Sequence, residues 1–171
     1  MPGEVMQILV YPNPLLRKPA EVVRDLADID QKCEEMFRIM YDHKGVGLAA
    51  TQVGIDQRFF IMNAGGAPAK DLVLVNPVIV EGTGELITEE GCLSLPGLEM
   101  KLPRYEWVKV RATTLDGGEI ELEGDGVFAR AVQHELDHLN GTLIIDKVSP
   151  ALRIALRPRL REMEKKFRAK K

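Results

Sequence analysis

The chain has 171 residues and a formal net charge of −3, with 45% hydrophobic and 29% charged residues. This is the balance of a globular domain, so it excludes a disordered or fibrous chain, and the length predicts one domain over residues 1–171. No apolar run approaches the roughly 18 residues of a membrane span, and no secretory signal opens the chain. We therefore expect a cytoplasmic protein without membrane contact, in which the two cysteines stay reduced.

The first predicted elements are a short strand-like segment at residues 8–10 and a long helix. Apolar residues recur at helical spacing from Asp25 to His43, which predicts an amphipathic helix that ends before Gly45. Cys33 lies on the apolar stripe of this helix, so it is expected to be a small buried side chain.

A β-rich region follows the helix. The candidate strands are residues 58–62, 72–80, 85–89, 107–114 and 119–123. They have no helices between them, which indicates mainly antiparallel sheet. The segment 64–69 is predicted to be a surface turn, and residues 116–118 to close a hairpin.

A second helix is predicted from Gly126 to about Asn140, with Asp125 as its cap. It is apolar on more than one face and should be central. A third helix is expected in the tail, interrupted or kinked near Pro158. The predicted fold class is α+β, with mainly antiparallel β-sheets packed around the central helix, and with an N-terminal and a C-terminal helix.

The predicted central helix carries the pattern HExxH at residues 134–138. Residues at i and i+4 share one face of a helix, so His134 and His138 can bind one metal ion. Glu135 can then take a proton from a water on that metal. The pattern alone is also compatible with two histidines that are solvated or packed in a core.

A catalytic metal usually has three protein ligands and one open position, so a third ligand must come from elsewhere. The residues that remain available are His43, Cys92, Asp146, Glu162 and Glu164. Cys92 is the strongest candidate, because it lies in a turn rich in Gly and Pro that can hold a thiolate rigidly. With two imidazoles and a thiolate, iron, nickel, cobalt and zinc are all plausible occupants.

Three motifs occur in order along the chain. They are GVGLAATQ at 45–52, EGCLS at 90–94 and QHELDH at 133–138. With these motifs the chain resembles the peptide deformylase family, from about residue 6 to residue 150. The resemblance implies a single catalytic domain that hydrolyses the N-formyl group from the initiator methionine of nascent polypeptides and releases formate.

The resemblance also implies roles for individual residues. Cys92, His134 and His138 would bind one divalent cation, commonly Fe2+ in the family, with Zn2+, Ni2+ or Co2+ as possible substitutes. Glu135 would be the general base and acid. The Gln52 side-chain amide and the Leu93 backbone N–H would stabilise the oxyanion.

For the substrate, the resemblance implies an extended peptide lying against the protein backbone. The residues expected to bind its main chain are Gly45, Val46, Gly47 and Gly91. An apolar pocket for the methionine side chain is expected near Val127, Phe128 and Ala131. One departure from the family pattern is Glu99, which stands where several bacterial relatives have an Arg that contacts the substrate.

The tail differs in charge from the rest of the chain. Residues 151–171 carry nine Lys/Arg and two Glu, a balance of +7, which leaves −10 on residues 1–150. A basic tail suggests contact with a polyanion, and some family members dock on the ribosome through a C-terminal helix. We therefore expect ribosome binding by this segment, and a monomeric protein.

Two rival functions remain open. In a structural zinc module, His43 would be a fourth ligand and Glu135 would have no task. In a zinc endopeptidase, Asp146 would be the third ligand, since it follows an apolar strand-like segment at 143–145. Asp137 is expected to be buried on the central helix and paired with Arg104 or Arg130.

Overall fold

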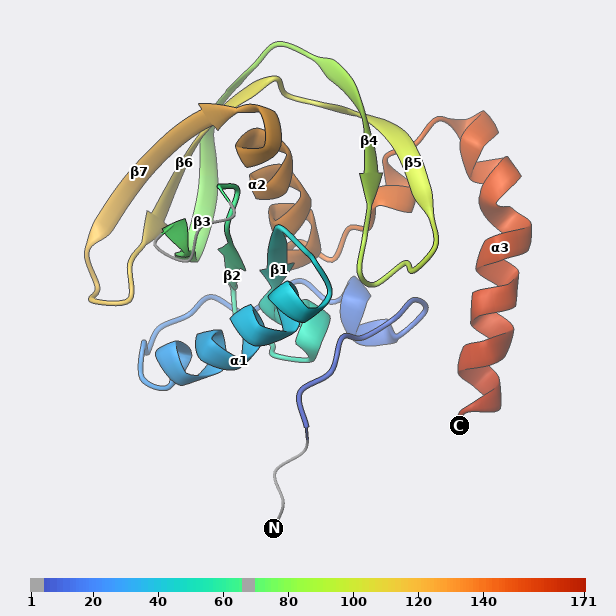
Figure 1. Ribbon diagram of the computed structural model, residues 1–171, viewed down its shortest axis with the longest axis horizontal. Coiled ribbons are helices and arrows are strands. Elements are labelled where there is room, and N and C mark those ends of the chain that lie inside the picture. The colour runs from blue at the N-terminus through green and yellow to red at the C-terminus, as the bar shows by residue number, and fades with distance from the viewer. Residues whose placement is uncertain (1–4, 66–69) are drawn as a thin grey trace.

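In the computed structural model, which describes residues 5–65 and 70–171, helices and antiparallel sheets surround a central helix (Figure 1). The helices are α1 (Ile29–Asp42), α2 (Gly126–Leu139) and α3 (Pro150–Ala169). The strands are β1 (Gly47–Ala49), β2 (Phe59–Met62), β3 (Leu72–Thr83), β4 (Leu86–Gly91), β5 (Glu99–Arg104), β6 (Trp107–Thr113) and β7 (Glu119–Asp125). Short 3-10 helices are η1 (Pro14–Arg17), η2 (Ala50–Val53) and η4 (Ile144–Asp146).

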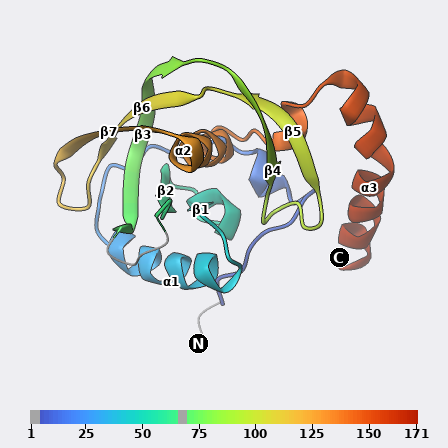
Figure 2. The same ribbon diagram turned by 45° about the horizontal axis from the view of Figure 1, so that its top comes forward.

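The strands form two antiparallel sheets. One has five strands in the order β1-β2-β3-β6-β7, and the other is the β4-β5 pair. Figure 2 shows β3 and β6 on one side of α2 and the β4-β5 pair on the other. The predicted fold class, α+β with antiparallel sheets around the HExxH helix, is confirmed.

Helix α2 is central because its sequence offers apolar side chains to more than one neighbour. Ala129, Val132 and Leu139 pack into one buried cluster with side chains of the five-stranded sheet, including Phe60 and Val108. The same helix buries Gln133, Glu135 and His138. Buried polar groups require partners, which the site must supply.

Helix α1 covers the other face of the β1-β2 region. Its buried residues include Cys33, Met36 and Met40, which pack with Phe59 and Ile61. Cys33 is 2% exposed, as expected for a small buried side chain. The helix begins at Ile29, later than the predicted Asp25, because the Asp25 carboxylate accepts a hydrogen bond from the Ala27 N–H in a turn.

Several other sequence-based expectations differ from the structure. Residues 8–10 and 143–145 form no strand, and Asp125 precedes α2 without a side-chain cap. Strand β5 was not predicted, although its residues alternate between exposed and buried. Of the expected turn at 64–69, residues 66–69 lie outside the described residues.

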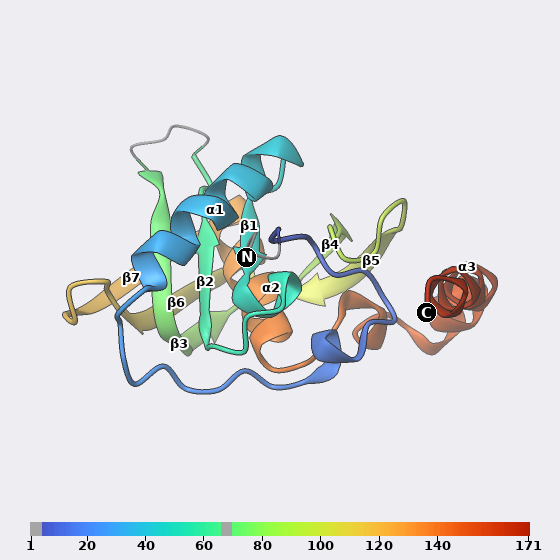
Figure 3. The same ribbon diagram turned by 90° about the horizontal axis from the view of Figure 1, so that it is seen from below.

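Helix α3 runs continuously through Pro158, so of the predicted interruption or kink the interruption is wrong. The Ser149 side chain accepts a hydrogen bond from the Leu152 N–H, and Pro150 occupies the first turn, where its missing N–H costs nothing. Figure 3 shows α3 at the margin of the molecule. No helix in the described ranges combines the length and apolar character that crossing a bilayer requires.

Candidate metal centre

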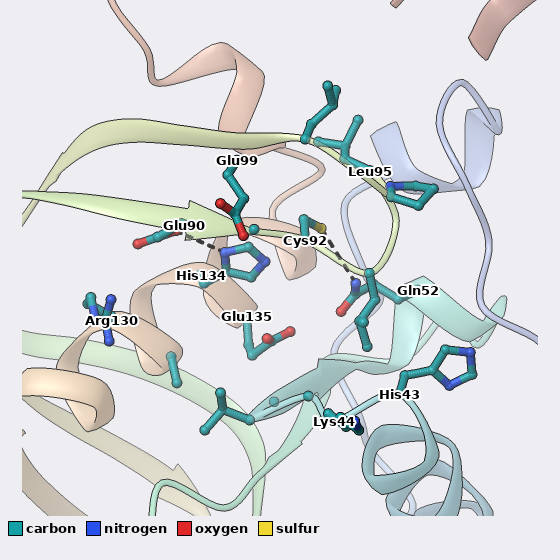
Figure 4. A pocket seen from close by; sticks show the side chains of 18 of the residues that line it. His43, Lys44, Gln52, Glu90, Cys92, Leu95, Glu99, Arg130, His134 and Glu135 are labelled. Atoms are coloured by element: carbon teal, nitrogen blue, oxygen red, sulfur yellow. Dashed lines mark hydrogen bonds and ion pairs between the residues drawn. The ribbon is translucent and has the colours of Figure 1, made fainter. Parts of the chain in front are cut away.

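The three predicted metal ligands come together. Cys92 directly follows β4, whereas His134 and His138 are one turn apart on α2, and their ligand atoms all lie within 4.8 Å of one another. The two Nε2 atoms are 3.2 Å apart, and the Cys92 sulfur is 3.3 Å from the Nε2 of His138. Figure 4 shows Cys92 and His134 entering one cavity from different elements.

These separations fit a bound divalent ion. Two nitrogens at about 2.0–2.1 Å from a tetrahedral metal lie about 3.3 Å apart, and a sulfur at about 2.3 Å lies about 3.5 Å from each nitrogen. The spacing is therefore that of two edges of a coordination tetrahedron. Burial and the neighbouring His134 lower the pKa of His138 well below its ordinary value. Burial would also lower the pKa of His134, but the hydrogen bonds to Cys92 and Glu90 outweigh it and raise this pKa well above its ordinary value.

The other candidate ligands have different partners. Asp146 pairs with Arg17 and Arg153, Glu162 with Lys166, and Glu164 with Tyr11. The Nδ1 of His43 lies 2.8 Å from the carbonyl oxygen of Ile39, and this ring stands on the cavity wall outside the ligand cluster. The structural-zinc and endopeptidase readings are therefore not favoured.

A buried carboxylate fixes the orientation of the first imidazole. Glu90 Oε2 lies 3.0 Å from the Nδ1 of His134, so the Nε2 of that ring is left for the metal. Arg104 donates to both oxygens of Glu90, at 2.7 and 2.9 Å. Burial alone would raise the pKa of Glu90, but the hydrogen bonds from Arg104 and His134 outweigh it and lower the pKa to about 2.

Arg104 also contacts Asp137, an acidic residue on α2. Its guanidinium donates to Asp137 Oδ2 at 2.7 Å, and Lys147 lies 3.1 Å from the other oxygen. The expected pairing of Asp137 is thus confirmed with Arg104, and Arg130 lines the cavity. The side chain of Arg104 is 2% exposed, so its charge is compensated by the two carboxylates and not by solvent.

Glu135 lies beside the ligand cluster on α2. It is 4% exposed, and its Oε2 has no hydrogen-bond partner among the described residues. Burial raises the pKa of this carboxyl group to about 7, which suits a group that must both accept and release a proton near neutral pH. A Cβ at Gly47 would lie 2.8 Å from Glu135 Oε1 and 2.9 Å from its Cγ, so any side chain here would force Glu135 to shift.

The amide of Gln52 has a fixed orientation. Its oxygen accepts a hydrogen bond from the Ala49 N–H at 2.9 Å, and its nitrogen donates to Ser94 Oγ at 3.1 Å. The same nitrogen lies 3.9 Å from the Cys92 sulfur, as the dashed line in Figure 4 marks. One amide N–H is therefore donated to the buried Ser94, and the amide nitrogen lies on the side of Cys92.

One cavity of about 620 Å³ contains most of the predicted site; His138, which is 2% exposed, is not among its lining residues. The predicted site residues on its wall are Gly45, Val46, Gly47, Gln52, Gly91, Cys92, Leu93, Val127, Ala131, His134 and Glu135. Phe128 is not on this wall; it packs in the core beside Gly124. The sequence analysis assigned no role to Glu90 or Ser94. Both lie within two residues of Cys92 in the EGCLS motif, and this proximity was the sequence feature that could have indicated them.

The fold and the site are those of a metallohydrolase in which one HExxH helix and one cysteine can hold a metal ion. A model of the polypeptide deformylase family matches residues 5–153. A peptide deformylase of Thermodesulfovibrio yellowstonii is 41% identical over 170 residues, which cover 98% of this chain and 99% of the relative. The chain belongs to the peptide deformylase family.

Solved structures agree with this assignment. A peptide deformylase from Legionella pneumophila is 39% identical, with a TM-score of 0.88 over 98% of this chain and 99% of that one. A peptide deformylase from Thermotoga maritima is 42% identical, with a TM-score of 0.79 over 86% of this chain and 99% of that one. The protein is accordingly a metal-dependent hydrolase that removes the formyl group from nascent peptides.

Proposed function

We propose that Cys92, His134 and His138 hold one divalent ion at which the formyl group of an N-formyl-methionyl peptide is hydrolysed to formate. The observation that carries this assignment is the convergence of three ligand atoms within 4.8 Å beside the buried Glu135. Fe2+ is the ion that we propose in the cell, although the same ligands suit Zn2+, Ni2+ and Co2+. When bound, such an ion polarises a carbonyl oxygen and lowers the pKa of water at the site.

The protein residues then transfer the proton and stabilise the developing negative charge. Glu135 accepts a proton from the attacking water and returns it to the leaving amine. The Gln52 amide and the Leu93 backbone N–H donate hydrogen bonds to the oxyanion. Removal of one such donor typically raises the barrier by about 2.7–4 kcal/mol.

The peptide lies in the cavity as an extended strand. Among the described residues, strand β1 pairs with β2 alone and strand β4 with β5 alone. Both therefore present a free edge, and both contribute residues to the cavity wall. An extended chain can add to such edges through its main-chain groups. Val46, Gly47 and Gly91 supply these hydrogen bonds, next to Gly45, and the methionine side chain contacts Val127 and Ala131.

The substitution Glu135→Ala tests this function. It should leave the metal content unchanged and reduce formate release from formyl-Met-Ala-Ser to near background, because the proton acceptor is gone. Glu85→Ala, an exposed change outside the cavity, is the control. Normal turnover in metal-replete Glu135→Ala protein, or cleavage of unformylated proteins by the wild type, would refute the assignment.

The choice of Fe2+ has its own test. Protein that is purified without oxygen should contain iron and lose activity in air, because both a thiolate and Fe2+ oxidise. Metal analysis alongside a formate assay measures both quantities. Zinc as the sole metal, with activity stable in air, would contradict this choice.

We further propose that the protein is a cytoplasmic monomer and that residues 151–171 bind the ribosome. Nine cations stand on this segment, most of them exposed on α3. Truncation after Pro150 should abolish salt-sensitive pelleting with ribosomes and leave turnover of short peptides nearly unchanged. Pelleting that survives the truncation would contradict this role.

A further inference from the structure

The side chain of Glu99 lies beside Gly91, and both residues line the cavity. Glu99 is the first residue of β5 and pairs in register with Gly91, the last residue of β4. A Cβ at Gly91 would lie 3.8 Å from the Cγ of Glu99. Figure 4 shows the Glu99 carboxylate pointing from β5 into the cavity that contains His134.

This carboxylate differs from its buried neighbour on β4. Glu90 is engaged by Arg104 and His134, whereas the exposed side chain of Glu99 has no ion pair or hydrogen bond within residues 5–65 and 70–171. Its negative charge is therefore not matched by a cation of the protein and is available to a ligand in the cavity.

The proposed extended peptide determines which of its residues faces Glu99. Successive side chains of a strand point to opposite faces. If the methionine side chain contacts Val127 and Ala131 on α2, the next side chain points away from α2, toward the wall formed by Gly91 and Glu99. Figure 4 shows Arg130 of α2 and Glu99 of β5 on separate walls.

We propose that Glu99 makes the enzyme favour a basic residue, Lys or Arg, directly after the formyl-methionine. Glu89 is a second exposed carboxylate on the cavity wall, but it pairs in register with Lys101 of β5, so Glu99 carries the preference. The opposing cations on the cavity wall are Lys44 and Arg130, with His43 beside them. Because they come from the α1-β1 loop and from α2, they lie on other walls than Glu99. This inference rests on the proposed function.

The experiment compares kcat/KM for formyl-Met-Lys-Ala, formyl-Met-Gln-Ala and formyl-Met-Glu-Ala in low salt. An exposed ion pair of this kind gives about a 5-fold effect, so the Lys peptide should exceed the Glu peptide by about 5- to 10-fold in the wild type. The ratio should fall toward 1 at high salt, because exposed charges are screened. Glu99→Gln should bring it near 1, and Glu99→Lys should invert it.

Glu85→Gln is the matched control, since it removes an exposed carboxylate of the same hairpin outside the cavity; its ratio should equal that of the wild type. Three outcomes would overturn the inference. They are an unchanged ratio in Glu99→Gln, a preference of the wild type for the Glu peptide, and an equal or larger Lys-to-Glu ratio when the charged residue is placed third in the peptide. These outcomes all require turnover of the Gln peptide. Its failure to release formate would instead contradict the proposed function.

Discussion

The metal centre and helix α3 are both rich in charge, but they hold it in opposite ways. At the metal centre, Arg104 and Glu90 are 2% and 6% exposed and bind each other through two hydrogen bonds. On α3 the cations are mostly exposed, and Leu160 is the buried residue of the helix. The comparison indicates that the effect of an ionic group on folding stability is determined by its burial more than by the number of charges nearby.

Breaking the buried network should have the largest effect. Arg104→Met leaves the carboxylates of Glu90 and Asp137 without their shared cation, which should cost about 3–5 kcal/mol of unfolding free energy. Metal affinity should fall about 10- to 100-fold, because Glu90 no longer orients His134 firmly. Urea denaturation and metal titration measure the two effects.

The control for this comparison is Arg153→Met on α3. Its guanidinium is 54% exposed and lies 3.6 Å from Asp146, so the loss should stay within about 0.5 kcal/mol. Equal losses of unfolding free energy in Arg104→Met and Arg153→Met would show that burial does not explain the difference between the two regions.

An intermediate effect is expected where α3 meets the body. Leu160 packs with Leu95, Leu98 and Leu143, so Leu160→Ala should cost about 2 kcal/mol. Formate release from short peptides at low temperature should remain close to that of the wild type, since Leu160 is not on the wall of the catalytic cavity. A loss of turnover as large as that of Glu135→Ala would mean that α3 supports catalysis directly.

An effect smaller than that of Leu160→Ala depends on pH. Tyr11 donates a hydrogen bond to Glu164 on α3 at 2.7 Å, and burial together with this carboxylate raises the pKa of Tyr11 to about 12. The folded state thus binds the phenol proton more tightly than the unfolded state does. The contribution, about 1 kcal/mol, is complete below pH 10 and is lost as the pH rises from 10 to 12.

Tyr11→Phe should remove this contribution and flatten the stability curve between pH 10 and 12, as measured by urea denaturation at several pH values. If the unfolding free energy of Tyr11→Phe falls as steeply above pH 10 as that of the wild type, other groups are responsible for the loss of stability at alkaline pH.

The parts predicted from sequence are those with local signals. The i, i+4 spacing in HExxH fixes the shared face of His134 and His138, and a helix with apolar residues on several faces must be buried. Strand β5 was missed because Pro103 and charged residues interrupt its apolar pattern, although an edge strand tolerates proline.

The contacts of Arg104 depend on how the β4-β5 pair lies over α2, which no local pattern encodes. The expected burial of Asp137 predicted a cationic partner, but two arginines satisfied that argument equally. In the structure the Asp137 side chain is 14% exposed, so it is only partly buried. Only the fold distinguishes the two arginines, because it brings Arg104 from the end of β5 to α2 and leaves Arg130 on the cavity wall.

The separation of the metal ligands along the chain bears on how the enzyme is made. Cys92 and His138 are 46 residues apart, on a hairpin and on a helix that meet only in the assembled fold. During translation, a growing chain that has passed Cys92 but not His138 has an incomplete set of metal ligands. Loading of the ion is therefore a late event in biogenesis, and the newly made enzyme becomes competent only as its last third emerges.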